Sequence, residues 1–335
     1  MNILSPIATG SGAHIVHKNL EHGINDYTVI PYQPYRTLFP PSLWPIGRKS
    51  KPTIVHTTPD YALFHKQRNV PLVLTFHGYV LDQYMSAYSS FLQRVHYQTD
   101  LKWFTKLSLG SADKITSVSN YTAQLVEQDQ GLSKKIQVIY NGVDESIFVP
   151  IKDYKKSSKN IRVLFSGNLK TSKGAQWLFP ILKKLGKNIT ILYTSGLRGK
   201  GALSEHPRLI NVGKIEHKNM PELYQSADIL LFPTVREGLP LVVLEAMACG
   251  LPVVATNCSS LPELIDSGKG GFLCGLGDVD DFANKINLLA ENINLREEMG
   301  AYNRANVEKK FTLNRMVSEY KELFERQLDV AISKP

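Results

Sequence analysis

Short apolar runs alternate with longer amphipathic stretches along almost the whole chain. This alternation is typical of parallel sheets covered by helices. The first part of the chain contains six runs that predict strands, namely Asn2–Ser5, Tyr27–Ile30, Thr53–His56, Leu72–Phe76, Lys114–Val118 and Ile136–Ile139. Helices are expected near 13–22, 60–68, 84–110 and 119–129. The five prolines within 31–45 predict a surface loop, because proline fits neither a helix interior nor an inner strand.

The alternation pauses at residues 150–160, a polar stretch that is the best linker candidate. It then restarts with six further strand candidates, namely Ile161–Ser166, Ile189–Thr194, Arg208–Val212, Ile229–Phe232, Val253–Ala255 and Gly271–Leu273. Helices are expected near 173–186, 219–226, 240–249, 278–291, 294–309 and 312–330. We therefore expect two doubly wound α/β domains of similar size. Such sheets bind ligands at the carboxyl ends of their strands, and the cleft between the domains is the natural site.

Composition and charge exclude several classes of protein. The chain has 335 residues, of which 43% are hydrophobic and 21% charged, which excludes a disordered protein. The net charge of +9 is scattered, since residues 1–150 carry 13 basic and 10 acidic groups and residues 151–335 carry 26 and 20. No arginine-rich stripe with interleaved aromatics is present, so a dedicated nucleic-acid binder is not expected.

Cysteine usage and hydropathy point to a cytoplasmic protein. The three cysteines have no Cys-x-x-Cys spacing, which indicates neither a disulfide framework nor a zinc site and fits a reducing compartment. The amino terminus has no signal-peptide pattern. The longest apolar stretch, Leu239–Thr256, is interrupted by two prolines and a glutamate, so it is too short to span a bilayer.

The segment 233–256 carries the most chemistry. A buried strand ends near Phe232, Pro240 stands where a helix can begin, and Gly250 would end that helix. Free amides at such a helix start, with the positive end of the helix dipole, form an anion site suited to a phosphate. Glu237 and Glu245 flank it, and dipole complementarity is the simpler explanation for either glutamate alone. Glu245, however, lies in an otherwise apolar helix, so its carboxylate needs a partner, and ligand hydroxyls would serve.

Two other patterns exclude a bound dinucleotide and a metal. Gly10 and Gly12 follow the first strand, but Ile15 stands where a dinucleotide-binding fingerprint has its third glycine. The acidic run Asp278–Asp281 resembles a metal-binding motif, yet it precedes a helix and is better explained as its cap. We expect no cofactor and no catalytic metal.

Glu237 and Glu245 form a Glu-x7-Glu signature that continues as Glu-Ala-Met-Ala-Cys-Gly-Leu-Pro-Val-Val-Ala-Thr. Other matching segments occur in order, at 75–78, 112–119, 140–150, 166–174 and 223–228. Through these segments, residues 1 to about 325 resemble the retaining glycosyltransferases of family 4. Their fold is GT-B, two Rossmann-like doubly wound domains facing across a cleft. The resemblance implies an acceptor-side domain at 1–150, a donor-binding domain at 151–311, and a final helix at 312–335 that packs back toward the amino-terminal domain.

This resemblance implies a retaining hexosyltransferase. The enzyme would move a sugar from a UDP- or GDP-linked donor to a hydroxyl of a glycan or lipid-linked acceptor, in the synthesis of polysaccharide, glycolipid or cell-envelope glycan. Its mechanism would be a same-face displacement in which the leaving phosphate takes the acceptor's proton. Two alternatives stay open. One is a glycosyl phosphorylase or sugar-phosphate synthase on the same fold, and the other is a non-catalytic subunit that binds nucleotide sugars.

The resemblance also assigns roles to individual residues. Glu237 would hold hydroxyls of the donor sugar, Glu245 the ribose hydroxyls, and Lys173 would neutralise the diphosphate as the bond to the sugar breaks. His77 would contact the sugar or the acceptor. The backbone groups that approach the donor would be those of Gly10, Gly12, Gly238, Leu239, Leu241 and Val242.

The chain departs from the family pattern at two places. Asn168 stands where the family usually has an arginine, so either Lys170 compensates or the diphosphate is stabilised less. Ser259 and Ser260 stand where the family more often has a pair of glycines.

The segment Tyr84–Leu107 mixes aromatic residues with Arg94, Lys102 and Lys106. Its simplest interpretation is a long domain helix with its apolar side in the core. The alternative is a peripheral contact with a membrane surface, as a basic amphipathic helix can make.

Overall fold

The chain forms two compact units, each built around its own parallel sheet. The computed structural model describes residues 1–133, 135–151, 160–195, 203 and 205–333. The first unit comprises Met1–Gly142 together with the segment from Leu313 onward, and the second comprises Val143–Thr312. The expected linker at 150–160 falls largely outside the described residues. Two six-stranded α/β units are what the alternation of the sequence predicts.

In the first unit the strand order is β2-β1-β3-β4-β5-β6, and all pairs are parallel. The strands are β1 (Ile3–Ala8), β2 (Tyr27–Tyr32), β3 (Ile54–Thr57), β4 (Leu72–Phe76), β5 (Lys114–Ser117) and β6 (Gln137–Val138). Pro31 is tolerated in β2 because β2 is an edge strand. The rest of the proline-rich stretch forms two short 3₁₀ helices, η1 (Pro34–Leu38) and η2 (Pro40–Leu43).

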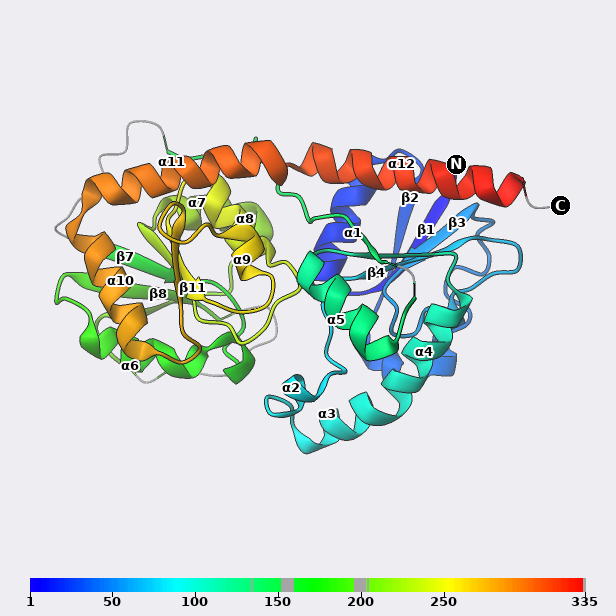
Figure 1. Cartoon of the computed structure of the whole chain (residues 1–335), viewed down its shortest axis with the longest axis horizontal. Helices are drawn as coiled ribbons and strands as arrows, with labels where there is room; N and C mark the ends of the chain where they lie inside the picture. The colour runs from blue at the N-terminus through cyan, green and yellow to red at the C-terminus, as the bar shows by residue number, and fades with distance from the viewer. Residues whose placement is uncertain (134, 152–159, 196–202, 204, 334–335) are drawn as a thin grey trace. The chain divides into compact units, whose positions relative to one another are not determined.

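Helices cover both faces of this sheet (Figure 1). The α-helices of this unit, with the π-helical turn η4 (Tyr97–Leu101), are α1 (Gly12–Gly23), α2 (Gln83–Ser86), α3 (Phe91–His96), α4 (Lys102–Ser111), α5 (Asn120–Gln130) and α12 (Leu313–Ile332). Of these, α2 and α3 project away from the sheet (Figure 1). Helices α4 and α5 pack with β3 and β4 in one apolar cluster. Helices α1 and α12 lie together, with Tyr320 and Phe324 of α12 against His56 of β3.

Two expected helices of this unit are wrong in extent. The one near 60–68 is only a 3₁₀ turn, η3 (Ala62–Phe64). The one near 84–110 is divided, because Ser90 accepts the amide of Gln93 and the Gln93 side chain accepts the amide of Ser90. This capping box starts a new helix at Phe91.

In the second unit the order is β12-β11-β10-β7-β8-β9, again all parallel. The strands are β7 (Ile161–Phe165), β8 (Ile189–Thr194), β9 (Leu209–Gly213), β10 (Ile229–Phe232), β11 (Val253–Thr256) and β12 (Gly271–Cys274). The helices are η5 (Thr171–Lys173), η6 (Ala175–Trp177), α6 (Leu178–Lys184), η7 (His217–Asn219), α7 (Met220–Gln225), α8 (Leu241–Ala248), α9 (Leu261–Leu264), α10 (Val279–Glu291) and α11 (Ile293–Lys310).

Helices α6 and α10 share one apolar cluster with the strands of this sheet, while α8 contacts both α7 and α11 (Figure 1). The helix expected at 173–186 is shorter, because Gly174 adopts a left-handed conformation with φ +78°. Asp278 caps α10 by accepting the amide of Asp281, as predicted.

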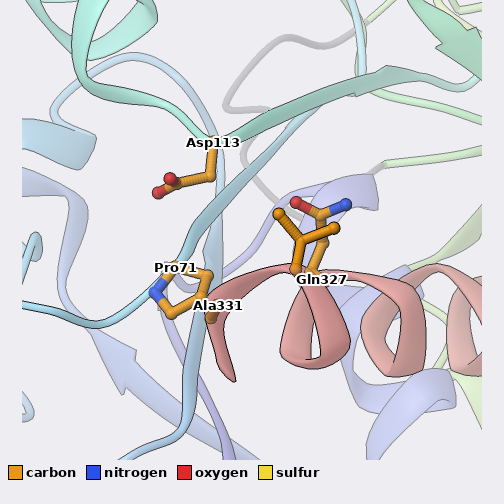
Figure 2. Close-up of a pocket in the computed structure, with 5 residues that line it drawn as sticks. Pro71, Asp113, Gln327 and Ala331 are labelled. Atoms are coloured by element: carbon orange, nitrogen blue, oxygen red, sulfur yellow. The ribbon is translucent and has the colours of Figure 1, made fainter. Parts of the chain in front are cut away.

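A small pocket lies at the amino-terminal edge of the first sheet, away from the strand ends that carry the candidate residues. Its volume is about 50 Å³. Figure 2 shows Pro71 and Asp113 opposite Gln327 and Ala331 of α12. The carboxylate of Asp113 already has hydrogen-bond partners within the protein. It accepts a hydrogen bond from the amide of Leu72 at 2.9 Å and one from the ammonium of Lys66 at 3.2 Å.

Candidate functional site

The candidate residues of the second unit gather where its strand order reverses. From β7 the chain proceeds outward through β8 and β9, and from β10 it proceeds outward on the other side through β11 and β12. The neighbours β7 and β10 therefore define a topological switch point, the usual ligand site of such sheets. Lys173 follows β7, and Glu237 follows β10.

Lys173 and Glu237 form an ion pair at this switch point. The Nζ of Lys173 lies 2.5 Å from Oε1 of Glu237, and the hydroxyl of Thr234 lies 2.8 Å from the same oxygen. The carboxylate is 11% exposed and the lysine side chain 31%. The pair thus places one cation and one acceptor group at a partly open edge of the sheet.

Backbone contacts hold the two loops together. The carbonyl of Ser172 accepts the amide of Val235 at 3.0 Å and lies 3.1 Å from the Thr234 hydroxyl. A Cβ on Gly174 would lie 2.0 Å from the carbonyl oxygen of Pro233, so only glycine allows this approach. The position of Lys173 relative to Glu237 is therefore set by rigid backbone.

A third loop, after β11, supports Glu237. Ser259 accepts the amide of Glu237 at 3.0 Å. It does so from a left-handed conformation with φ +48°, which costs a non-glycine residue about 1–2 kcal/mol. A glycine would adopt this left-handed backbone without strain. The serine adds a hydroxyl, which forms the hydrogen bond with the Glu237 amide that a glycine could not form.

Helix α8 begins beside the ion pair. Pro240 is its N-cap residue, none of the described side chains caps it, and Gly250 follows its carboxyl end in a left-handed conformation. Leu241 and Val242, in its first turn, are half-buried, whereas the rest of the helix is buried. The sequence predicts this helix start and its end correctly. Its first amides and the dipole favour an anion there.

Glu245 is buried, and the chain itself supplies its partners. The hydroxyl of Tyr224 donates to Oε2 at 2.7 Å, and Nε2 of His217 lies 3.1 Å from Oε1. The prediction that this carboxylate needs partners is confirmed, and Tyr224 and His217 are two of them. Each carboxylate oxygen can accept two hydrogen bonds, so acceptor capacity for ligand hydroxyls is left.

The His217–Glu245 pair predicts a pH dependence of stability. Its hydrogen bond to Glu245 raises the pKa of His217 above the usual 6.5. The pair then stabilises the fold fully below pH 6.5, and this contribution is lost as the pH rises through the raised pKa. Half of the His217 side chain is exposed, so the effect stays below about 1 kcal/mol. In thermal unfolding, His217→Gln is expected to be less stable than the unmodified protein at pH 5.5 and equally stable at pH 8.5. A difference that is the same at both pH values would contradict it.

Gly10, Gly12 and His77 belong to the first unit. Gly10 has φ +72°, and Ser11 caps α1 by accepting the amide of His14 at 3.2 Å. A Cβ on Gly12 would meet no atom within 4 Å, so the chain itself does not require glycine there. His77 follows β4, and its Nε2 lies 3.0 Å from Nε2 of His17 on α1.

Sequence reasoning missed the side chains that hold the glutamates and His77. Tyr224, His217 and His17 reach their partners through tertiary packing, and no local spacing marks them. Asn168 and Lys170 lie after β7, half-buried and exposed respectively, and the amide of Lys170 donates to the Asn168 carbonyl at 2.8 Å.

Comparisons with known proteins agree with this architecture. A family model described as Glycosyltransferase Family 4 matches residues 6–147, and one described as Glycosyl transferases group 1 matches residues 160–292. N-acetyl-α-D-glucosaminyl L-malate synthase of Bacillus anthracis is 26% identical over 330 residues, which cover 90% of this chain and 82% of that protein.

Two solved structures share the fold. Sucrose-phosphate synthase from Thermosynechococcus elongatus superposes with a TM-score of 0.83 at 18% identity, covering 99% of this chain and 100% of that one. HepE of Anabaena, in complex with UDP-glucose, superposes with a TM-score of 0.80 at 20% identity, covering 97% and 100%. The fold is therefore GT-B. With both family models matched in order, the chain belongs to the glycosyltransferases, its first part to family 4 and its second to group 1.

Proposed function

We propose that this glycosyltransferase moves a hexose from a nucleotide-diphosphate sugar to a hydroxyl of a glycan or lipid-linked acceptor, with retention of configuration. The observation that carries the proposal is the arrangement at the second switch point. There a lysine, a carboxylate and an uncapped helix start lie together, with a second buried carboxylate in the same helix. A diphosphate, a sugar and a ribose present the groups that these would bind.

Each of these groups has a role in the proposed reaction. The amides of Gly238, Leu239, Leu241 and Val242 bind the distal phosphate, and Lys173 offsets the charge that the diphosphate gains as the sugar leaves. Glu237 accepts hydrogen bonds from sugar hydroxyls, and Glu245 from ribose hydroxyls. The leaving phosphate takes the proton of the acceptor hydroxyl as the new bond forms on the same face. We propose that the lysine and the amides supply the positive charge and that no metal is required.

The first unit contributes the rest of the proposed machinery. We propose that the backbone at Gly10 and Gly12 approaches the donor and that His77 contacts a hydroxyl of the sugar or the acceptor. UDP or GDP is the expected nucleotide. HepE, which shares the fold, is a protein solved with UDP-glucose. We also propose a cytoplasmic location, because the three cysteines are free thiols, as a reducing compartment keeps them.

Thermal unfolding with a panel of nucleotides tests the donor assignment. The panel holds UDP, GDP, ADP, their sugar conjugates, sugar phosphates and inorganic phosphate, each with and without magnesium. At 100-fold excess over its Kd, a ligand stabilises the fold by about 2.7 kcal/mol. Stabilisation by one nucleotide family, unchanged by magnesium, supports the proposal. Stabilisation by sugar phosphates or phosphate alone would contradict it and favour a phosphorylase.

Gly12→Ala separates folding from donor binding. The substitution is expected to leave stability unchanged or raise it by about 0.4–1 kcal/mol, because the new Cβ meets no atom and alanine restricts the unfolded chain. Donor affinity, measured by titration with the nucleotide sugar found in the panel, is expected to fall at least tenfold as the methyl group blocks the approach. Gly110→Ala in α4 is the matched control, since a Cβ there is equally free. Equal donor affinity in both variants would remove Gly12 from the site.

We further propose that α3 and α4 contact an anionic membrane surface. The side chains of Phe91, Leu92 and Trp103 are 70%, 79% and 59% exposed. Arg94 and Lys102 are exposed on the same two helices. By contrast, Tyr97 and Phe104 pack into an apolar cluster with Leu101. These three side chains therefore face the core, as the simpler interpretation of this segment predicts. Among the described residues, no helix is long and apolar enough to cross a membrane.

Sedimentation with lipid vesicles tests this surface. We expect the protein to bind vesicles containing phosphatidylglycerol more than vesicles of phosphatidylcholine alone, because basic residues near the surface add about 1 kcal/mol each. The double variant Leu92→Ser, Trp103→Ser is expected to lose most of this binding. Leu288→Ser, at a 43% exposed leucine of α10, serves as the control. Binding that survives the double variant would place the contact elsewhere.

A further inference from the structure

Two imidazoles lie side by side in the interior of the first unit. His17 of α1 and His56 of β3 are fully buried, and their rings stack with centroids 4.5 Å apart. Buried ring nitrogens are costly unless each finds a hydrogen-bond partner. Their partners form a continuous chain of hydrogen bonds that reaches His77.

The first part of this chain runs from His77 to His56. Nε2 of His77 lies 3.0 Å from Nε2 of His17. Nδ1 of His17 lies 2.6 Å from the hydroxyl of Ser5 and 2.8 Å from that of Tyr27. The Tyr27 hydroxyl in turn lies 2.7 Å from Nδ1 of His56.

The second part runs from His56 to a backbone carbonyl. Nε2 of His56 lies 2.7 Å from the hydroxyl of Thr75, which lies 2.7 Å from that of Thr116. The Tyr320 hydroxyl of α12 lies 3.3 Å from Thr75. The Thr116 hydroxyl donates to the carbonyl oxygen of Leu74 at 3.2 Å.

The rings of this chain are neutral. Burial lowers the pKa of His17 and of His56 well below the usual value, and it lowers the pKa of His77 to about 3. Burial also raises the pKa of the Tyr27 hydroxyl well above its usual value. Each imidazole therefore carries one N–H donor and one acceptor nitrogen, and the question is which nitrogen carries the hydrogen.

The carbonyl of Leu74 sets the direction of the chain, because a carbonyl oxygen can only accept. Thr116 donates to it and so accepts from Thr75. Thr75 then has no hydrogen left for His56, so Nε2–H of His56 donates to Thr75. With its hydrogen on Nε2, His56 accepts at Nδ1 from the Tyr27 hydroxyl.

The same direction continues to His77. The Tyr27 hydrogen points to His56, so the Tyr27 oxygen is free to accept, and the Ser5 hydroxyl donates its own hydrogen to that oxygen. His17 is then left to donate its Nδ1–H to the oxygens of Ser5 and Tyr27. Nε2 of His17 must then accept, and His77 donates its Nε2–H to it. Nδ1 of His77 is left as an acceptor, and it is buried without a hydrogen-bond partner among the described residues.

We propose that this chain fixes His77 as the Nε2–H tautomer, so that its Nδ1 accepts a hydrogen bond from a substrate hydroxyl, with His17 and Thr116 as positioning residues. The inference rests on the proposed function, in which His77 contacts a hydroxyl of the sugar or the acceptor. A buried acceptor without a donor is unfavourable, and a hydroxyl supplies the donor. The opposite tautomer would present an N–H, which a carbonyl or phosphate oxygen could accept as well as a hydroxyl oxygen.

Nuclear magnetic resonance of protein labelled with ¹⁵N at histidine reads each tautomer directly, without substrate. Two-bond ¹H–¹⁵N correlations distinguish a protonated from an unprotonated ring nitrogen, and single His→Gln variants assign the signals. At pH 7.5 we expect Nε2–H for His77 and His56 and Nδ1–H for His17. Finding His77 or His17 in the opposite tautomer would overturn the proposal.

The variant Thr116→Val tests the direction of hydrogen-bond donation at Thr116, the residue that donates to the Leu74 carbonyl. Without the Thr116 hydroxyl, the Thr75 hydrogen is free to donate to His56, so His17 is expected to carry its hydrogen on Nε2 in a measurable share of the molecules. Thr105→Val is the matched control, because Thr105 is buried in the same unit and its hydroxyl has no partner among the described residues. The control is expected to keep all three tautomers.

Unchanged tautomers in a folded Thr116→Val variant would overturn the role of Thr116. If that variant does not fold, the tautomers of the unmodified protein still decide the proposal. The test is also independent of the donor assignment. If no nucleotide of the panel stabilises the protein, the proposed function is contradicted, but the measured tautomers still stand. If instead the tautomers differ from those expected, the proposal about His77 fails and nucleotide binding is unaffected.

Discussion

Replacing Lys173 with methionine is expected to lower kcat by roughly 10²–10³-fold, which corresponds to about 2.7–4 kcal/mol of transition-state stabilisation. Lys173 is paired with Glu237 at the switch point of the second sheet and is held there by the backbone around Gly174. Methionine keeps most of the unbranched apolar side chain, which ends one heavy atom earlier, and removes the charge, so in the proposed mechanism the departing diphosphate loses its cation. The measurement is steady-state transfer with the donor that stabilises the protein in the nucleotide panel.

Two other lysines make the test specific. Lys184 forms an exposed ion pair with Asp280 in the same unit, and Lys184→Met is expected to change neither kcat nor stability by more than about 0.5 kcal/mol. The variant Lys170→Met tests whether this exposed lysine supplies the positive charge that the family's usual arginine would supply at position 168. We expect a smaller loss than for Lys173. An equal loss at Lys170 would show that the charge on the diphosphate is shared, and full activity of Lys173→Met would remove Lys173 from the mechanism.

Much of the fold could be predicted because buried parallel strands are short apolar runs bounded by polar loops. All twelve expected strands overlap observed ones. Helix extents were harder to predict where a distant contact or a local cap decides them. The helix expected at 173–186 starts late because Gly174 packs on the carbonyl of Pro233, about 60 residues further along the chain, a contact that no local periodicity encodes.

The candidate site also has one part that could be predicted from the sequence and one part that could not. The start of α8 and the positions of Glu237 and Glu245 follow from proline, glycine and strand signals in one stretch of sequence. The groups that hold these glutamates come from elsewhere in the fold, as Tyr224 and Ser259 illustrate. The sequence indicates that a buried carboxylate needs partners. It does not indicate that a tyrosine from α7 is one of them.

Glu245→Gln is expected to weaken nucleotide binding by roughly 10–100-fold, because hydrogen bonds to a charged acceptor contribute about 1.5–3 kcal/mol. The variant is expected to fold. The glutamine carbonyl can still accept from the Tyr224 hydroxyl, and its amide can donate to Nε2 of a neutral His217. What it loses is the carboxylate that we propose accepts both ribose hydroxyls.

Comparing UDP with 2′-deoxy-UDP by titration calorimetry makes this prediction specific to the ribose, and GDP with its 2′-deoxy form replaces that pair if GDP is the nucleotide that binds. The unmodified protein is expected to prefer the ribonucleotide, and Glu245→Gln to lose most of that preference. Glu222→Gln, at an exposed glutamate of α7, is the matched control and is expected to keep it. Equal binding of the ribonucleotide and its deoxy form by the unmodified protein would show that Glu245 does not hold the ribose. Its burial against Tyr224 and His217 would then be a structural role alone.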